Sequence, residues 1–225
     1  MTPYDLFTHI QDVEYTESGD KVNWRVEVNN EEKTVYLLFQ QSHGTRDWEN
    51  NLNFIQKSYR KFTVGPLYKL QTSFMLIHRG FGDSYKTAND EIMHVLTQTA
   101  SVYSDYKVVI CGWSLGAGLA ILACEDFNYR TRTVETDPNT GKKATLISFG
   151  SPMIIFGFIT RHYLRKCCES ATEYCQWNDV VSWLPPFLGF MHLKCVRLGE
   201  AFKIKKLFNP LEYHTHYGNK ELYTK

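Results

Sequence analysis

The stretch from Lys107 to Cys124 constrains the fold more than any other, because a β-branched run passes directly into a run of small apolar residues. Val108 to Ile110 is typical of a buried strand, and Leu115 to Cys124 is typical of a helix. Between them, Gly112-Trp113-Ser114-Leu115-Gly116 matches the pattern G-x-S-x-G of a sharp strand-to-helix turn. Such a turn exposes the serine hydroxyl at the carboxyl end of a sheet, beside the N–H groups of a helix N-terminus. The pattern also occurs by chance, so a catalytic role for Ser114 depends on partners elsewhere.

Segments typical of strands alternate with segments typical of helices along the rest of the 225 residues. Residues 22–28 alternate between apolar and polar side chains, as a half-buried strand does. Residues 33–40 contain a continuous apolar run at 35–39, which is typical of a central strand. We expect further strands at residues 68–72, 73–78, 144–149, 172–177, 193–198 and 202–208, helices at residues 3–17, 84–103, 115–124 and 154–168, and a loop at residues 209–218. Asp83 or Ser84 is expected to cap the second of these helices. This order predicts one α/β domain over residues 1–225, with a mostly parallel central sheet, helices on both faces and antiparallel edge strands.

Charge and hydropathy exclude several classes of protein. The net charge is only +1 and the two signs are interspersed, so nothing indicates a nucleic-acid-binding surface. No apolar run approaches the roughly 20 residues of a membrane-spanning helix. Residues 1–7 contain neither the basic nor the apolar region of a signal peptide. We therefore expect a cytoplasmic location, with release by lysis or a non-standard route as the alternative.

The six cysteines have no arrangement in the sequence that predicts a shared site. Cys111 and Cys124 lie in the expected strand and helix around Ser114 and are expected to be buried free thiols. The cysteines at positions 167, 168, 175 and 195 have no zinc-site spacing, and the sequence contains no C-x-x-C. We expect all six to be reduced, and we expect neither a metal nor a cofactor.

A serine nucleophile needs a base, and the base needs an acid to orient it. On sheets with this turn the chain order is serine, acid, histidine, and Asp179 satisfies it directly after an expected strand. The alternative for Asp179 is an Asx turn before Val180. Four histidines follow the serine, at positions 162, 192, 214 and 216. The first is expected to be solvated and the second structural, whereas spacing does not choose between His214 and His216.

A polar segment follows the central strand at residues 33–40. It runs from Phe39 to Phe54, contains three asparagines with one serine and one glycine, and carries Trp48 and Leu52. One interpretation is a surface loop followed by a helical turn. The other is that its beginning supplies a backbone N–H to the active site, while its tail forms a cover with an apolar face.

Several of the segments described above, together with two further motifs, follow one another in a fixed order along residues 33–218. The segments are Phe39–Trp48 with Leu52 and Phe54, Ile77–Tyr85 containing H-R-G-F, the turn at Ser114, Phe149–Pro152 with the pattern F-G-x-P, Asn178–Pro186, and His214-x-x-Tyr217. In this order they resemble the class 3 lipase family, which contains the filamentous-fungal triacylglycerol lipases. The joint occurrence is far more specific than any single motif.

The resemblance implies an α/β-hydrolase-type fold and a role for each matched residue. It implies Ser114 as nucleophile, Asp179 as triad acid and His214 as base, preferred over His216 because its spacing to Tyr217 matches that of the family. The oxyanion hole would use the backbone N–H groups of Ser42 and Leu115. No cofactor is implied.

The implied activity is hydrolysis of lipid acyl esters, by a triacylglycerol lipase or a phospholipase that contacts lipid or ester substrate and, transiently, a membrane or lipid-droplet surface. The alternatives are an esterase for small soluble esters and a non-catalytic interaction protein with the same scaffold. Three positions depart from the family pattern. Trp113 replaces the usual histidine and is expected to flank the serine without a chemical role, Gln40-Gln41 replaces Arg-Gly, and the lid-like segment 43–54 is polar. The oligomeric state is not predicted.

Overall fold

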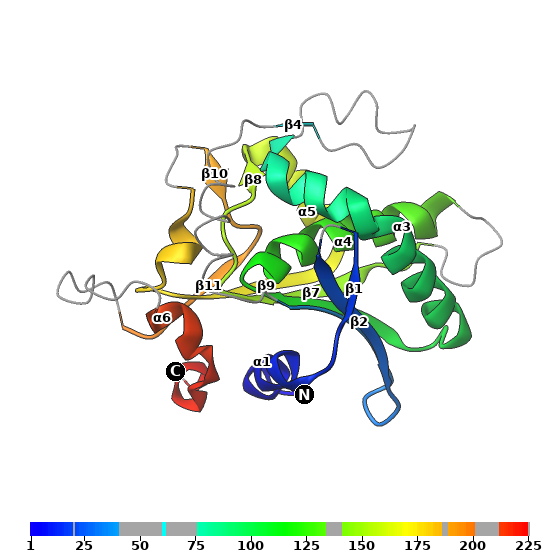
Figure 1. Ribbon diagram of the computed structural model, residues 1–225, viewed down its shortest axis with the longest axis horizontal. Coiled ribbons are helices and arrows are strands. Elements are labelled where there is room, and N and C mark those ends of the chain that lie inside the picture. The colour runs from blue at the N-terminus through cyan, green and yellow to red at the C-terminus, as the bar shows by residue number, and fades with distance from the viewer. Residues whose placement is uncertain are drawn as a thin grey trace.

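A mostly parallel sheet runs through the computed structural model, which describes residues 1–19, 21–40, 60–61, 76–133, 141–185, 189–200 and 212–224 (Figure 1). Within these residues the sheet has seven strands in the order β1-β2-β3-β6-β7-β9-β11. The strands are β1 (Thr16–Ser18), β2 (Val22–Asn29), β3 (Thr34–Phe39), β6 (Lys107–Trp113), β7 (Ala144–Phe149), β9 (Cys168–Gln176) and β11 (Cys195–Leu198). Strands β1 to β3 pair antiparallel, and β3 to β11 pair parallel. The predicted mostly parallel sheet with antiparallel edge strands is therefore confirmed.

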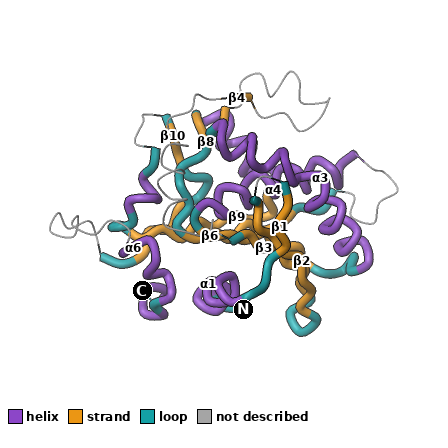
Figure 2. The backbone as a smooth tube through the Cα atoms, in the orientation of Figure 1, coloured by secondary structure: helices purple, strands orange, loops and turns teal. Residues whose placement is uncertain are grey.

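Helices cover both faces of this sheet, as predicted (Figures 1 and 2). The helices are α1 (Pro3–Asp12), α3 (Arg79–Val102), α4 (Leu115–Thr133), α5 (Phe158–Cys167) and α6 (Glu212–Thr215), with 3₁₀ turns η3 (Val180–Trp183), η5 (His216–Gly218) and η6 (Lys220–Tyr223). Helices α3, α4 and α5 lie on one face, and α1 and the C-terminal helices lie on the other. Among the helices that the structure describes, none combines the length and the apolar character needed to cross a membrane.

The central strands bury both faces because their side chains alternate between two apolar clusters. In β3, Val35, Leu37 and Phe39 pack toward α3 and α4, whereas Tyr36 and Leu38 pack toward α1. This burial on both faces explains why residues 35–39 form a continuous apolar run in the sequence.

Helix α1 is held at its start by a capping box. The Asp5 backbone N–H donates to Thr2 Oγ1 at 3.2 Å, and the Thr2 backbone N–H donates to Asp5 Oδ2 at 3.3 Å. Its buried face includes Phe7, whose ring centroid lies 5.4 Å from that of Trp113 and 5.7 Å from that of Tyr217. The N-terminal helix thereby packs against both the end of β6 and the C-terminal segment. It ends at Asp12, earlier than the expected 3–17.

A second, small antiparallel sheet was not predicted. Within the described residues it consists of β4 (Arg60–Lys61), β5 (Leu76–Ile77), β8 (Ile155–Phe156) and β10 (Phe190–Met191), in the order β10-β8-β5-β4. The expected strand at residues 73–78 thus contributes only β5 here, and it pairs outside the central sheet. The expected helix at residues 154–168 begins only at Phe158, because residues 155–156 are engaged in β8 and Gly157 adopts a φ of 84°.

Two helix boundaries also differ from the prediction. Helix α3 begins at Arg79 rather than after Asp83 or Ser84, because Phe81 is buried against Gly118 of α4 and fixes this first turn. Helix α4 continues to Thr133, well past Cys124. The residues that follow Cys124 stay buried through Phe127. Tertiary packing therefore extends the helix beyond the end that the polar sequence predicted.

The C-terminal segment is helical where a loop was predicted. Residues 212–218 form α6 and η5, and Tyr217 is completely buried. The predicted strands at residues 68–72 and 202–208 lie outside the described residues. The parallel strands β3, β6, β7 and β9 end along one edge of the sheet, where Phe39 pairs with Gly112 and Trp113 pairs with Phe149. This carboxyl edge is where α/β sheets place their sites.

Candidate active site

The turn between β6 and α4 holds Ser114 in strained backbone geometry. Its φ is 58°, a left-handed value that side chains with a Cβ rarely adopt. The Ser114 backbone N–H donates to the carbonyl oxygen of Phe149 at 2.9 Å, which fixes the turn against the end of β7. A Cβ on Gly112 would lie 2.2 Å from the backbone oxygen of Gly116, so the strand and the helix approach too closely for any other residue. The strained turn is the one that the G-x-S-x-G pattern predicts, but the predicted exposure of the hydroxyl is wrong, because Ser114 is only 1% exposed.

The same turn lies against the end of β3. A Cβ on Gly116 would lie 2.6 Å from the Phe39 oxygen and 2.7 Å from the Gln40 oxygen. Leu115 begins α4, so its N–H belongs to the first turn, where backbone donors have no intrahelical acceptor. The start of α4 and the end of β3 are therefore adjacent. Ser42 and the segment 43–54 lie outside the described residues.

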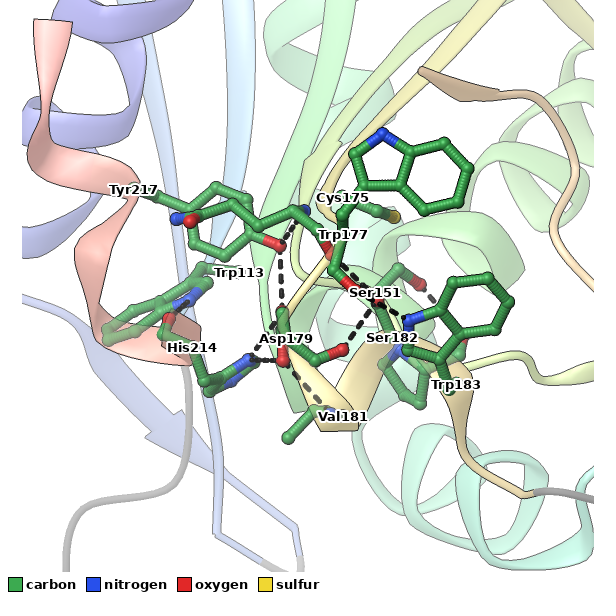
Figure 3. A network of polar contacts seen from close by, with 12 residues as sticks. Trp113, Ser151, Cys175, Trp177, Asp179, Val181, Ser182, Trp183, His214 and Tyr217 are labelled. Carbon is green, nitrogen blue, oxygen red and sulfur yellow. Dashed lines mark hydrogen bonds and ion pairs between the residues drawn. The ribbon is translucent and has the colours of Figure 1, made fainter. Parts of the chain in front are cut away.

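Asp179 and His214 form a buried pair at this edge (Figure 3). His214 Nδ1 lies 2.9 Å from Asp179 Oδ2 and 3.0 Å from Oδ1. The exposed fraction is 0% for Asp179 and 1% for His214. The Val181 backbone N–H donates to Asp179 Oδ1 at 2.9 Å, so the aspartate also caps η3. The Asx turn and the contact with His214 therefore occur together, because each oxygen of one carboxylate accepts more than one hydrogen bond.

Tyr217 is a third member of this network whose contact the sequence did not predict. Its hydroxyl donates to Asp179 Oδ2 at 2.7 Å and accepts from the Gln176 backbone N–H at 2.8 Å. Burial, followed by the charge of Asp179, raises the pKa of Tyr217 well above its ordinary value. The phenol thus stays protonated and donates to the carboxylate. In the sequence, Tyr217 was noted only as part of the motif His214-x-x-Tyr217, which gave no indication of this hydrogen bond.

Trp113 contacts His214 directly, and the sequence did not predict this contact. The indole and imidazole rings stack with centroids 5.7 Å apart and an interplanar angle of 25°. Indole Nε1 also donates to the His214 backbone oxygen at 3.3 Å. The alternation of β6 places Trp113 on the α1 face, where the C-terminal segment packs. That alternation was readable in the sequence, but the element on the other side of the contact was not.

Gly150 brings the serine turn and the buried pair together. It follows β7 directly after Phe149, whose oxygen accepts the bond from the Ser114 N–H. A Cβ on Gly150 would lie 2.9 Å from His214 Cε1 and 3.0 Å from Asp179 Oδ2, and its φ of 56° also suits glycine. The serine turn and the Asp179–His214 pair therefore both lie against the end of β7.

The other histidines that follow Ser114 lie in different surroundings. His216 is exposed and packs against Tyr213, with ring centroids 6.3 Å apart. His162 is exposed on α5, as expected. His192 is buried and contacts Glu173 instead of Asp179. The geometry thus makes His214 the histidine that Asp179 orients.

Comparison with known proteins gives concordant matches. A family model described as lipase (class 3) matches residues 36–189. A lipase of Rhizomucor miehei is 27% identical over 171 residues, covering 72% of this chain and 40% of that protein. The chain therefore spans less than half of the length of this curated relative.

Solved structures share the fold. The Lip2 lipase of Yarrowia lipolytica matches with a TM-score of 0.71 and 17% identity, covering 94% of this chain and 82% of that one. A triacylglycerol lipase whose catalytic centre is described as a serine protease triad matches with a TM-score of 0.65 and 23% identity, covering 83% of this chain and 64% of that one. At these identities the likeness is one of fold.

Proposed function

The chain belongs to the class 3 lipase family, and we propose that it hydrolyses acyl esters of lipids with Ser114, His214 and Asp179 as its triad. The observation that carries the proposal is the buried contact of His214 Nδ1 with Asp179 at 2.9 Å, beside a serine held at positive φ. A buried carboxylate, an oriented imidazole and a strained serine turn are the parts that acyl transfer requires. The lipase names of the relatives support an ester of a lipid as the substrate.

The reaction proceeds in two steps. His214 accepts the proton of Ser114 through Nε2 as Oγ attacks the ester carbonyl, because Nδ1 faces Asp179. The tetrahedral intermediate collapses, the bond to the alcohol oxygen breaks, and His214 returns the proton to the leaving alcohol. Water then attacks the acyl-enzyme with the same histidine as base. This second step releases the fatty acid and restores Ser114.

Two further parts of the proposal concern the charges that develop during the reaction. Asp179 stabilises the imidazolium, and its own position is fixed by hydrogen bonds from Tyr217 and Val181. The oxyanion would accept hydrogen bonds from the backbone N–H groups of Leu115 and Ser42, and the loss of one such donor costs about a hundredfold in rate. The close approach of α4 to the end of β3 supports the pairing of these two segments.

The experiment combines active-site labelling with a substrate panel. A fluorophosphonate probe is expected to label the wild-type chain and Ser101→Ala, because Ser101 lies within α3 and its hydroxyl donates to the Thr97 oxygen of the same helix. Ser114→Ala is expected to lose both the labelling and the hydrolysis of a p-nitrophenyl ester, with an unchanged circular dichroism spectrum. Labelling that persists in Ser114→Ala would contradict the nucleophile, and an unlabelled wild-type chain would favour a non-catalytic protein.

The substrate panel tests the lipid part of the proposal separately. Triglyceride, phospholipid and short-chain soluble esters are compared below and above their solubility limits. Faster turnover of the long-chain esters, increasing once an interface forms, is the expected result. Turnover confined to dissolved short esters would identify an esterase for small soluble substrates and would overturn the lipid assignment.

A further inference from the structure

Three ligand-bearing side chains meet at the β9–β11 edge of the sheet, away from Ser114. Cys175 lies near the end of β9, Cys195 begins β11, and His192 precedes β11. In the parallel register Cys195 lies opposite Glu173, and Arg197 lies opposite Cys175. Residues paired in this way share one face of a sheet, so the two cysteines are diagonal neighbours on that face.

The ligand atoms of this cluster converge. One atom from each of Cys175, His192 and Cys195 lies within 4.8 Å of the others. Cys175 Sγ is 4.0 Å from His192 Nε2. In a tetrahedral zinc site with ordinary bond lengths, such atoms are about 3.6–3.8 Å apart. A shift of a few tenths of an ångström would bring this sulfur and nitrogen to that distance.

A carboxylate orients the imidazole as it does in metal sites. His192 Nδ1 lies 3.2 Å from Glu173 Oε1, and Glu173 is completely buried. Glu173 Oε2 accepts from the Lys194 backbone N–H at 2.8 Å, so the carboxylate is itself fixed. Metal-bound histidines commonly donate their second ring nitrogen to a carboxylate in this way, which directs the other nitrogen at the metal.

We propose that Cys175, His192 and Cys195 bind a zinc ion. Two thiolates and one imidazole form a donor set that binds zinc in preference to calcium and magnesium, which bind oxygen ligands. Each thiol releases its proton to solvent as its sulfur binds the metal, His192 Nε2 releases to solvent the proton that it shares with the Ser182 oxygen, and Nδ1 keeps its hydrogen for Glu173. The Ser182 backbone oxygen, now 2.8 Å from Nε2, gives up that contact, and a water or this oxygen completes the tetrahedron.

The zinc ion is expected to act as a structural tie. It joins the end of β9, the segment before β11 and β11 itself. Cys175 shortly precedes Asp179 in the chain, and Ser182 Oγ donates to the Asp179 backbone oxygen at 2.8 Å (Figure 3). The ion thus fixes the segment that carries Asp179, without contact to Ser114. The proposal is independent of the proposed hydrolase activity.

Cobalt titration of the full reduced chain tests the site, because thiolate-bound Co²⁺ has an intense charge-transfer absorption. After removal of bound metal with a chelator, the wild-type chain is expected to take up one equivalent of Co²⁺ with this absorption and to release it to Zn²⁺. Cys195→Ser is expected to lose the absorption, and Glu173→Gln is expected to weaken binding about 10–100-fold. Cys167→Ser, at the buried end of α5, is the matched control and is expected to bind as the wild type does.

A second readout does not depend on colour. Zn²⁺ is expected to raise the melting temperature of the wild type and of Cys167→Ser, but not that of Cys195→Ser. Cys195 is only half-buried, so its serine variant is expected to fold and is therefore the variant used. Absence of thiolate absorption in the folded wild type, or equal absorption in Cys195→Ser, would overturn the proposal.

Discussion

Two buried histidines near the same end of β9 each face a buried carboxylate, yet their surroundings differ. His214 Nδ1 lies 2.9 Å from Asp179, and His192 Nδ1 lies 3.2 Å from Glu173. The first ring stacks on Trp113 and adjoins the turn that holds Ser114. The second faces a thiol and a backbone oxygen. A carboxylate–histidine pair therefore specifies an oriented imidazole, and what lies at the other nitrogen decides the chemistry.

The two carboxylates also differ in how the chain holds them. Asp179 lies after its strand, on a 3₁₀ turn, and accepts from the Tyr217 hydroxyl. Glu173 lies within β9 and accepts from a backbone N–H that precedes the neighbouring strand. The loop position places Asp179 at the carboxyl edge, where substrates bind to α/β sheets. The strand position makes Glu173 a tie between sheet elements.

The largest expected effect comes from matched neutral substitutions in the two pairs. Asp179→Asn is expected to lower kcat about 10⁴-fold without unfolding the protein, because the amide disturbs the tautomer and removes the charge that stabilises the imidazolium. The decrease in kcat caused by Glu173→Gln is expected to be smaller than that of Asp179→Asn by a factor of at least about a hundred. Glu173→Gln is also expected to lower the free energy of unfolding by about 1–3 kcal/mol. Steady-state kinetics and urea unfolding of both variants check this, and equal losses of kcat would contradict the distinction.

A third buried carboxylate sharpens the comparison because its described partner is a phenol. Tyr163 donates to Glu125 Oε1 at 2.7 Å, and burial raises the pKa of Glu125 to about 7. The folded state thus binds this proton more tightly than the unfolded state, so the contribution of this group to stability falls as pH rises from about 4.5 to 7. The expected loss between pH 5 and pH 8 is about 2–3 kcal/mol.

Urea unfolding at the two pH values measures this loss, with Glu125→Gln as the comparison. The glutamine variant cannot ionise, so it is expected to lack this part of the pH dependence. An unchanged pH dependence in the variant would show that Glu125 is already ionised in the folded protein at pH 5.

Tyr217→Phe tests the additional donor to Asp179. The variant removes one hydrogen bond to a buried charged group and leaves the Gln176 backbone N–H without its acceptor, so stability is expected to fall by about 1–2 kcal/mol. We expect kcat to fall about tenfold, with KM nearly unchanged, because the carboxylate becomes less well fixed. A loss of stability with full kcat would assign Tyr217 a purely structural role.

The smallest expected effect is that of Trp113→Phe. The variant keeps an aromatic ring against His214 but removes the weak hydrogen bond from Nε1 to the His214 oxygen. We expect a severalfold decrease in kcat, equivalent to about 1 kcal/mol. Kinetics of Trp113→Phe and Trp113→Ala separate the two contacts, and equal rates in the two variants would exclude stacking as a contributor.

The serine turn was predictable because its constraints are local. Apolar β-branched residues, two glycines and a small-residue helix occur within one short stretch, and the backbone sterics of that stretch dictate the positive φ at Ser114. The parallel sheet was predictable for a related reason, since buried strands and helices each leave a period in the sequence. Asp179 followed from its place after a strand, and the choice of His214 required the resemblance to the family.

The remaining features depend on which distant segments pack together, and no local period encodes that. The helical C-terminus forms because Tyr217 is buried against α1, which also brings the hydroxyl to Asp179. Trp113 meets His214 only through the same packing. The cysteine spacing predicted no metal site, because Cys175 and Cys195 become neighbours only when β11 pairs with β9 in one particular register. Local sterics and periodicity thus determined the serine turn and the sheet, whereas tertiary packing decided what surrounds each buried histidine.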